Sequence, residues 1–390
     1  MLSLRVAILT SGRFHVCDLA RELHLLGHKV VFYSCLPSRR TRQFGLPDRA
    51  ARSLLPWVAP AFLMMRRTQG TPLQHFGERL LIESIRRVAP RRIVACDVFI
   101  GMSGMSCDAA AMAREKFGAA VWIERGSRHI LSQQRILDEL EPANSRSAVS
   151  DFAVKQELAD YRVADRIAIP ARHVERSFLQ RGFDPAKLFV NPYGVDLEMF
   201  LPTPTPPRGP PTLLMVGAWS KRKGCDVLAE AWQSLSGVHL IHVGKVFDVP
   251  LPVSARFSHF TAVPQNRLSS FYAKGHVFVL ASREEGLATV QLQALACGLK
   301  LVCTDRTGGE DLKVLVADPS IITVVPHGDA AALAEALMVA LEQARSGSGI
   351  RDSLGASRQN LSWAAYAQRY SDALIAEFSR STRRANPVVR

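Results

Sequence analysis

The chain alternates short apolar runs with longer segments whose apolar residues recur at helical spacing. The runs that predict buried strands in the first half lie at 4–10, 28–34, 92–101, 119–124, 164–170 and 187–192. Helical patterns separate several of these runs, at 15–27, 105–117 and 172–181. Strands that alternate with helices in this way indicate parallel sheets with crossover helices.

The same pattern starts again after a proline-rich stretch. Residues 202–211, PTPTPPRGPP, contain six prolines, cannot pair within a sheet and are expected to form a stiff linker. Further strands are predicted at 212–217, 238–244, 276–282, 300–305 and 321–326, with helices at 222–235, 286–298, 328–345 and 362–378. The chain therefore predicts an α/β protein with two doubly wound, Rossmann-like domains that face each other across a cleft. Such sheets bind ligands at the carboxyl ends of their strands.

The composition agrees with this organisation. A length of 390 residues suits two domains, and 47% hydrophobic with 22% charged residues is typical of a soluble globular protein. No apolar run approaches the roughly 20 residues that span a bilayer, and the first run is too short for a signal peptide. The seven cysteines form no CxxC pair, so we expect reduced core residues in a cytoplasmic protein. The histidines show no metal-binding spacing, and neither a metal nor a cofactor is predicted.

Positive charge is concentrated at the start of the chain. The formal net charge is +14, and residues 1–92 carry 16 Lys and Arg against 5 Asp and Glu, a net +11. Such an excess attracts diphosphates, phospholipid head groups or nucleic acid, unless it serves only solubility. No nucleic-acid motif and no aromatic platform accompany these cations, so nucleic acid is not an expected partner.

Two loops of the second half each join a predicted strand to a helix start. In MVGAWSKRKG, residues 215–224, three cations precede a helix N-terminus, where they oppose the helix dipole unless an anion lies between them and the free amides. In SREEGLATV, residues 282–290, Gly286 allows close approach to the backbone at another helix start. Glu285 precedes this turn and Gln293 follows two turns later. The alternatives are a solvated basic turn and an ordinary amphipathic helix.

Several stretches, in this order along the chain, resemble retaining glycosyltransferases of family four, which have the GT-B fold. REEGLATVQLQALACGLKLVCTDRTGGEDL (283–312) resembles the donor-site consensus with its Glu-x7-Glu pattern, and TSGRFHVCDLARELHLLGHKVVFYS resembles the N-terminal glycine loop. ERGSRHILSQQRIL (124–137) and KLFVNPYGVDLEMF (187–200) resemble the ERGS-x-HI and NPYGVD segments of a bacterial subgroup. The terminal SWAAYAQRY resembles a helix that crosses back to the first domain. The resemblance covers essentially the whole chain, and its specificity lies in the combination of motifs.

The resemblance implies domain boundaries and roles. The acceptor-side domain would span 1–201 and the donor-binding domain 212–362, with the helix of about 363–390 crossing back. A nucleotide-diphosphate sugar would be the donor, and Glu285 would hold its sugar hydroxyls as a catalytic residue. The residues implied for the diphosphate are Gly12, Arg222, Lys223, Gly286, Leu287, Ala288 and Thr289, and those for the nucleoside are Gln293 and Val263.

On the first domain, the resemblance implies an acceptor side formed by Arg125, Ser127 and His15. Glu124 and His129, at the end of the 119–124 strand, would be further catalytic residues. For His129 the alternative is helix capping or hydrogen bonding in the core, and for His15 it is a solvated helix start. Catalysis would align the reactants and stabilise charge on the departing diphosphate with cations and helix ends, without a metal.

The sequence departs from the family pattern at four positions. Gln293 replaces the second acid of Glu-x7-Glu, which keeps an acceptor oxygen but loses charge-assisted strength. Ala218 stands where many relatives carry an arginine for the diphosphate, Ala171 replaces a serine and Lys300 a proline. We expect an active enzyme, with an altered donor or a weak activity as the alternative.

One segment bears on the location of the protein. RAARSLLPWVAPAFLMMRR (49–67) is mostly apolar, contains Trp57 and Phe62, and is bracketed by arginines. It either lies in the head-group layer of a membrane or packs as a buried connection under the first sheet.

The sequence therefore predicts a retaining hexosyltransferase that moves a sugar from a nucleotide-diphosphate sugar to a saccharide or lipid-linked acceptor. The expected process is the synthesis of a surface polysaccharide or glycan, in the cytoplasm or at the inner face of the membrane. The alternatives are a non-catalytic or decayed transferase that binds anions or a partner, and a nucleotide-sugar epimerase.

Overall fold

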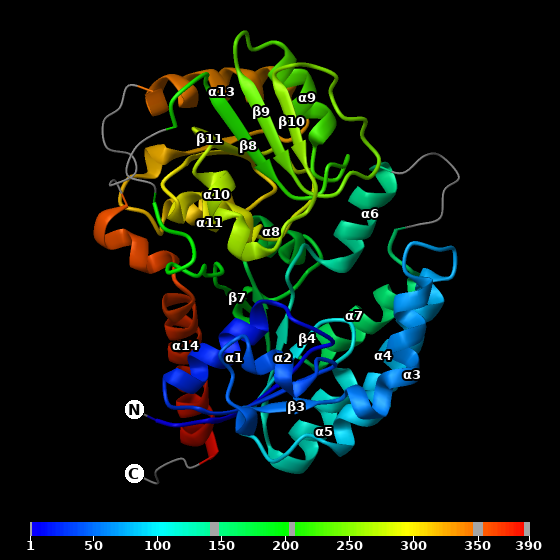
Figure 1. Ribbon diagram of the computed structural model, residues 1–390. Coiled ribbons are helices and arrows are strands. Elements are labelled where there is room, and N and C mark those ends of the chain that lie inside the picture. The colour runs from blue at the N-terminus through cyan, green and yellow to red at the C-terminus, as the bar shows by residue number, and fades with distance from the viewer. Residues whose placement is uncertain (1, 141–147, 203–206, 346–353, 386–390) are drawn as a thin grey trace.

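The computed structural model of this chain describes residues 2–140, 148–202, 207–345 and 354–385 (Figure 1). Its first sheet has seven parallel strands in the order β3-β2-β1-β4-β5-β6-β7. The strands are β1 Arg5–Leu9, β2 Lys29–Ser34, β3 Ala51–Ser53, β4 Val98–Met102, β5 Ala120–Glu124, β6 Arg166–Ile169 and β7 Leu188–Val190. The strand order reverses between β1 and β4, and doubly wound sheets bind ligands outside such a reversal.

The second sheet has six parallel strands in the order β10-β9-β8-β11-β12-β13. The strands are β8 Thr212–Val216, β9 His239–Val243, β10 Phe257–Phe260, β11 Val277–Leu280, β12 Lys300–Thr304 and β13 Ile322–Val325. The expected fold class, two doubly wound Rossmann-like domains, is confirmed.

Helices cover both faces of the first sheet. The helices described in the first half of the chain are α1 His15–Leu25, α2 Ser38–Arg42, α3 Leu55–Thr68, α4 Gln74–Val88, α5 Cys107–Phe117, α6 Ile130–Leu140, α7 Asp151–Val163 and α8 Arg172–Leu179. Figure 1 shows α1 on one side of the sheet and α4, α5 and α7 on the other, where α5 contacts both α4 and α7.

The helices of the second half are α9 Cys225–Gln233, α10 Ser269–Tyr272, α11 Thr289–Ala296, α12 Gly309–Lys313, α13 Ala330–Arg345 and α14 Trp363–Ala385. α9 and α13 pack together on the outer face of the second sheet, while α10 and α11 lie toward the first domain (Figure 1). α14 returns to the first domain and packs against α1. There His28 Nε2 lies 2.8 Å from Ser371 Oγ, and Arg369 donates to Asn191 Oδ1 at 2.7 Å.

Two apolar cores support this arrangement. One fills the first domain and continues into the inward face of the second, where it includes Phe278 and Leu292. The other lies under α9 and α13 and includes Trp232 and Leu337. All seven cysteines are buried and none forms a disulfide, as expected for core thiols. Since one core is shared, the inward faces of the two domains are held close together.

Some expected elements differ in the structure. The strand expected at 92–101 starts only at Val98. The side chain of Asp97, the residue before it, accepts a hydrogen bond from the backbone N–H of Arg5 at 2.7 Å and holds the end of the preceding loop against β1. Residues 49–67 form β3 and most of α3, rather than a buried connection, with Pro56 in the first turn of the helix. Part of the expected linker, residues 203–206, lies outside the described residues. Among the helices that are described, none is both long and apolar enough to cross a membrane.

Candidate functional site

The loop between β8 and α9 places its cations against the loop after β11. Gly224, at the start of α9, has a φ of +65°, and a Cβ at this position would lie 1.9 Å from the carbonyl oxygen of Ala281. Only glycine allows this approach. The start of α9 is therefore locked beside the residues that follow β11.

Arg222 and Lys223 are each paired with a carboxylate of that second loop. Arg222 Nη2 lies 2.7 Å from Glu284 Oε2, and the Lys223 ammonium contacts Glu285. Burial, together with the neighbouring Arg222, lowers the pKa of Lys223 to about 8. The structure thus brings together three of the groups that the sequence assigned to the donor, and adds Glu284 to them.

Glu284, which the sequence analysis did not single out, connects the two domains. Its carboxylate accepts hydrogen bonds from Ser127 Oγ and, at 3.2 Å, from Gln133 Nε2. Burial alone would raise the pKa of Glu284, but Arg222 and Ser127 outweigh it and the pKa is lowered. Its position next to Glu285 in the same loop could have indicated this residue. Its partners in the first domain could not be predicted from the sequence.

The two domains touch at Gly286. A Cβ on Gly286 would lie 1.8 Å from the carbonyl oxygen of Gly126, and His173 Nε2 is 2.7 Å from the carbonyl oxygen of Gly286. Part of the expected cleft is therefore filled by contact between the domains.

A second contact across the domains replaces a missing helix cap. Ala171 has no side chain that could cap α8, and the carboxylate of Asp311 instead accepts from the backbone N–H of Arg172 at 3.0 Å. The serine expected at 171 is thus compensated from the other domain.

The start of α11 is left open to an anion. Ala288, its N-cap residue, has no side-chain cap, and within the described part of the chain the amides of residues 286–289 donate to no acceptor. Free amides at a helix N-terminus bind anions. Leu287 and Ala288 are themselves buried, so only their backbone is available.

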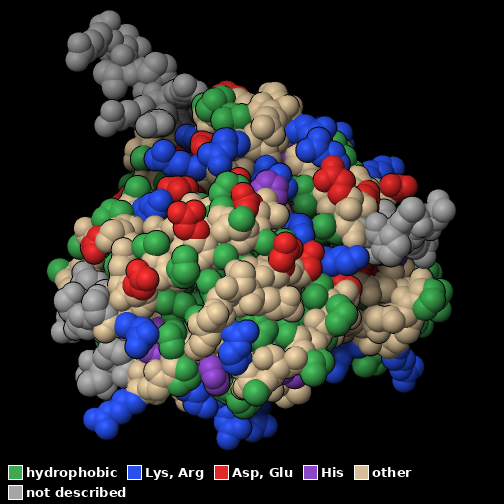
Figure 2. Space-filling view, turned by 90° about the horizontal axis from the view of Figure 1, so that it is seen from above, with side chains coloured by type: hydrophobic (Ala, Val, Ile, Leu, Met, Phe, Trp, Pro, Cys, Tyr) green, Lys and Arg blue, Asp and Glu red, His purple; other side chains and the backbone are tan. Residues whose placement is uncertain are grey.

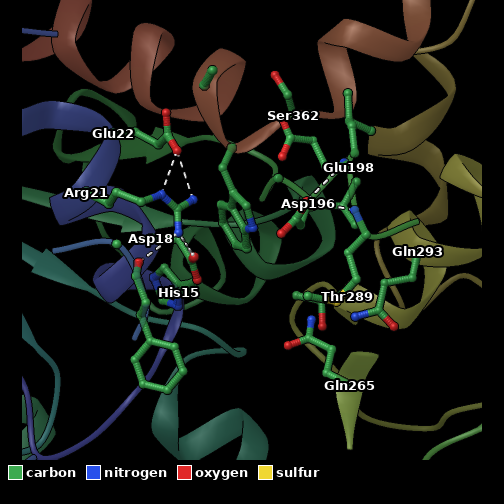
Figure 3. Close-up of a pocket in the computed structure, with 18 of the residues that line it drawn as sticks. His15, Asp18, Arg21, Glu22, Asp196, Glu198, Gln265, Thr289, Gln293 and Ser362 are labelled. Atoms are coloured by element: carbon green, nitrogen blue, oxygen red, sulfur yellow. Dashed lines mark hydrogen bonds and ion pairs between the residues drawn. The ribbon is translucent and has the colours of Figure 1, made fainter. Parts of the chain in front are cut away.

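A cavity of about 1190 Å³ opens between the domains, next to the second turn of α11. Figure 3 shows His15 and Asp18 on one side of this cavity and Thr289, Gln293 and Gln265 on the other. The remaining lining comes from residues 194–199, 43–45, 358–359 and 362–364, with Arg13, Phe14, Arg21, Glu22, Leu25, Leu201 and Asn266.

Gln293 is a buried residue at the cavity wall rather than an exposed helix residue. Its Oε1 accepts from Tyr272 Oη at 2.8 Å. This bond fixes the side chain and leaves the amide nitrogen as its remaining polar group. Tyr272 was not predicted, because it lies in a separate short helix.

His15 and Glu124 form a pair on the opposite wall. His15 Nε2 lies 2.8 Å from Glu124 Oε2, and the imidazole stacks on the ring of Tyr193 at 4.3 Å between centroids. The other oxygen of Glu124 is buried without a hydrogen-bond partner among the described residues. The pair links a cavity-lining side chain to the carboxyl end of β5.

Four predicted residues lie elsewhere. His129 is buried among the rings of Tyr161, Phe178 and Phe183, and burial lowers its pKa to about 4. The structure favours the structural alternative for His129, since the backbone N–H of Leu131 donates to its Nδ1 at 3.3 Å.

The other three are Arg125, Gly12 and Val263. Arg125 is buried and paired with Glu157 at 2.8 Å, beneath Ser127. Gly12 lies beside the cavity residue Arg13, and Val263 packs against the shared core next to Gln265. None of the three is among the residues that line the cavity, as far as the described chain extends. That same part of the chain holds no cluster of three or more His, Cys, Asp or Glu suited to a metal ion.

Comparison with known proteins agrees with this geometry. Residues 210–343 match a family model described as glycosyl transferases group 1. A stretch of 186 residues is 29% identical to a phosphatidylinositol N-acetylglucosaminyltransferase subunit of Arabidopsis thaliana, covering 44% of this chain and 40% of that relative. The match thus spans less than half of the relative's length.

Solved structures show the same fold over nearly the whole chain. Sucrose-phosphate synthase from Thermosynechococcus elongatus superposes with a TM-score of 0.68 at 17% identity, covering 96% of this chain and 99% of the other. Anabaena HepE in complex with UDP-glucose gives a TM-score of 0.64 at 13% identity, covering 96% and 100%. The comparisons therefore show that residues 210–343 are similar to glycosyl transferases group 1, and that the chain shares the two-domain fold of these solved structures.

Proposed function

We propose that this chain is a retaining glycosyltransferase of the family-four type that acts on a nucleotide-diphosphate sugar. One observation carries the proposal: Arg222, Lys223 and Glu285 meet just before the uncapped start of α11, and Thr289, the first residue of that helix, lines a cavity of about 1190 Å³. This volume exceeds the range of about 300–1,000 Å³ typical of small-molecule sites. The group 1 match covers all of these second-domain residues.

The diphosphate of the donor would bind Arg222, Lys223 and the amides of residues 286–289. Both cations are now neutralised by carboxylates, so the phosphates must compete with Glu284 and Glu285. Glu284 is anchored by Ser127 and Gln133, whereas Glu285 would turn to the sugar hydroxyls. Binding therefore requires the contact at Gly286 to loosen, with Gly12 facing the phosphates from the first domain.

The nucleoside would occupy the open cavity. Gln293 would donate its amide N–H to a ribose hydroxyl oxygen, because its Oε1 is already held by Tyr272. Gln265, which lines the cavity, and the nearby Val263 would lie against the base.

The acceptor would approach from the wall that carries His15. Glu124 holds Nε2 of His15, so Nδ1 would be the ring nitrogen that meets an acceptor hydroxyl. The hydroxyl would attack the face from which the diphosphate departs, and the departing charge would be stabilised by Lys223, Arg222 and the α11 amides. No metal is needed in this scheme, because these groups supply the positive potential.

We further propose a saccharide or lipid-linked acceptor and a role in the synthesis of a surface polysaccharide or glycan in the cytoplasm. Support comes from the relative in Arabidopsis thaliana, part of a phosphatidylinositol N-acetylglucosaminyltransferase, whose name specifies a lipid acceptor. The free, buried cysteines agree with a reducing compartment.

Incubation of the purified protein with a panel of nucleotide sugars tests the proposal. We expect hydrolysis or transfer with at least one donor, and transfer to a saccharide acceptor should retain the anomeric configuration in the product. An epimer formed without an acceptor would indicate an epimerase. Binding of nucleoside diphosphates without turnover would indicate a decayed transferase, and the absence of any binding would refute the transferase.

A further inference from the structure

The helix α3 has apolar residues on both of its faces. Val58 and Ala61 are buried against the first domain. On the outward face, Trp57 is 46% exposed and Leu63 is 54% exposed, and Pro60 and Met64 are exposed between and beside them. Spacings of three and four residues place this set on one stripe of the helix. Arg92 lies against Trp57, and the other side chains of the stripe are exposed.

The start of α4 extends this stripe. Leu73 and Phe76, at the turn from α3 into α4, are 62% and 58% exposed. The two helices pack directly on each other at the edge of the first domain (Figure 1). Gly77 permits this, because a Cβ there would lie 2.0 Å from Thr68 Oγ1. We call the exposed residues Trp57, Leu63, Met64, Leu73 and Phe76 the α3–α4 patch.

Unpaired cations surround the α3–α4 patch. Arg66 and Arg67 are exposed at the end of α3, and neither pairs with a carboxylate of the residues that the structure describes. The guanidinium of Arg92 lies 3.8 Å from the centre of the Trp57 ring. By contrast, on the face shown in Figure 2, Lys and Arg side chains are interspersed with Asp and Glu.

We propose that the α3–α4 patch docks the protein on an anionic lipid bilayer. Aliphatic and aromatic side chains would enter the acyl boundary, while Arg66, Arg67 and Arg92 bind lipid phosphates. The net charge of +11 over residues 1–92 adds a long-range attraction to such a surface. The α3 helix has 14 residues, so it lies in the interface and does not span the membrane. This docking does not depend on the proposed transferase reaction.

Sedimentation with vesicles tests the proposal. Wild-type protein should bind vesicles that contain phosphatidylglycerol and bind pure phosphatidylcholine much more weakly. The double variants L63E/M64E and R66Q/R67Q should each lower the partition coefficient on anionic vesicles about tenfold or more. The matched control is M338E/V339E on α13, where Met338 is 51% exposed in the other domain, and it should bind like the wild type.

Quenching by brominated lipids gives a second measurement that needs no charged variant. It should reduce the tryptophan fluorescence of the wild type, and this loss should disappear in Trp57→Phe. The proposal fails if the wild type does not bind anionic vesicles, if it binds neutral vesicles equally well, or if the α13 control loses as much binding. Binding to vesicles without quenching of Trp57 would also overturn the proposal, because the α3–α4 patch would then not contact lipid. A protein partner would be the next occupant to test. Turnover of nucleotide sugars in solution, measured separately, would be unaffected by any of these outcomes.

Discussion

The loop that leads into α11 and the helix itself lie along the same gap between the domains, but only the helix borders the cavity, through Thr289 and Gln293. In the loop, Gly286 is pressed against Gly126, and Glu284 is bonded to Ser127. Two turns further, Gln293 lines the cavity of about 1190 Å³. The closed region contains Arg222, Lys223 and their carboxylate partners, whereas α11 presents only neutral polar side chains to the cavity, whose opposite wall carries Asp18 and Arg21.

This difference affects the two parts of the donor differently. A diphosphate in the closed region must compete with carboxylates for the cations, whereas a nucleoside in the open region does not. In the closed region, each cation already has a carboxylate partner. A diphosphate therefore gains only the free energy by which its interaction with the cation exceeds that of the carboxylate it displaces. In the open region, a nucleoside would replace water alone. Variants in the closed region should therefore have larger effects than those in the open one.

The largest effect is expected for Lys223→Ala. The change removes the half-buried ammonium that would stabilise the departing diphosphate, so kcat/KM for the nucleotide sugar should fall about 100-fold or more. The control is Lys221→Ala, because Lys221 is exposed and bonds Asp248 only through its backbone N–H. Steady-state kinetics with the active donor provide the measurement. Equal rates for Lys223→Ala and the control would remove Lys223 from the proposed site.

Gly286→Ala tests the contact between the domains. The added Cβ would meet the carbonyl oxygen of Gly126, so the contact must open, at a cost of about 1–3 kcal/mol in the free energy of unfolding. Misalignment of the two halves should also lower kcat about tenfold. Thermal unfolding and kcat provide the measurements.

Ser127→Ala is the matched control for that variant, because it removes one hydrogen bond to Glu284 without adding volume. It should cost about 0.5–1.5 kcal/mol, less than Gly286→Ala. If Ser127→Ala were the more harmful of the two, the hydrogen bond rather than close packing would hold the domains together.

Local chemistry explains what could be predicted from the sequence. The alternation of apolar runs predicted the strands of both sheets except the edge strands β3 and β10. The turns around Lys223 and Gly286 indicated an anion site, because a glycine and a helix start are features of neighbouring residues. The contacts of Glu284 with Ser127 and of Asp311 with Arg172 join residues more than 130 positions apart. No local pattern encodes such pairs.

His129 shows the same limit of sequence-based prediction, here for a residue whose local position suggested a role. Its position after a strand matched a catalytic residue, yet Tyr161, Phe178 and Phe183 enclose the ring. Those three rings come from α7, α8 and the loop that follows α8, and only tertiary packing brings them to His129. A strand-end histidine is therefore ambiguous until its neighbours are known.

The pH dependence of donor binding should follow Lys223. Burial lowers its pKa to about 8, so the ammonium is present below that pH and is lost as the pH rises through it. The affinity for a nucleotide sugar, whose diphosphate does not titrate in this range, should fall about tenfold between pH 7 and pH 9. Lys223→Arg keeps its charge and should bind with little change over the same range. A wild-type profile as flat as that of Lys223→Arg would contradict the assignment.

The smallest effect is expected in the open region, for Gln293→Glu. A carboxylate at this position still accepts from Tyr272 and presents a second oxygen to ribose hydroxyls, which form stronger hydrogen bonds to a charged group. Burial of the charge opposes this gain, so the affinity for the donor should increase by about threefold to tenfold. Tyr272→Phe combined with Gln293→Glu should cancel the increase, because the buried carboxylate loses its fixed partner. Weaker binding by Gln293→Glu alone would mean that the ribose hydroxyl cannot turn its O–H toward the new carboxylate and requires the amide N–H of Gln293 as donor.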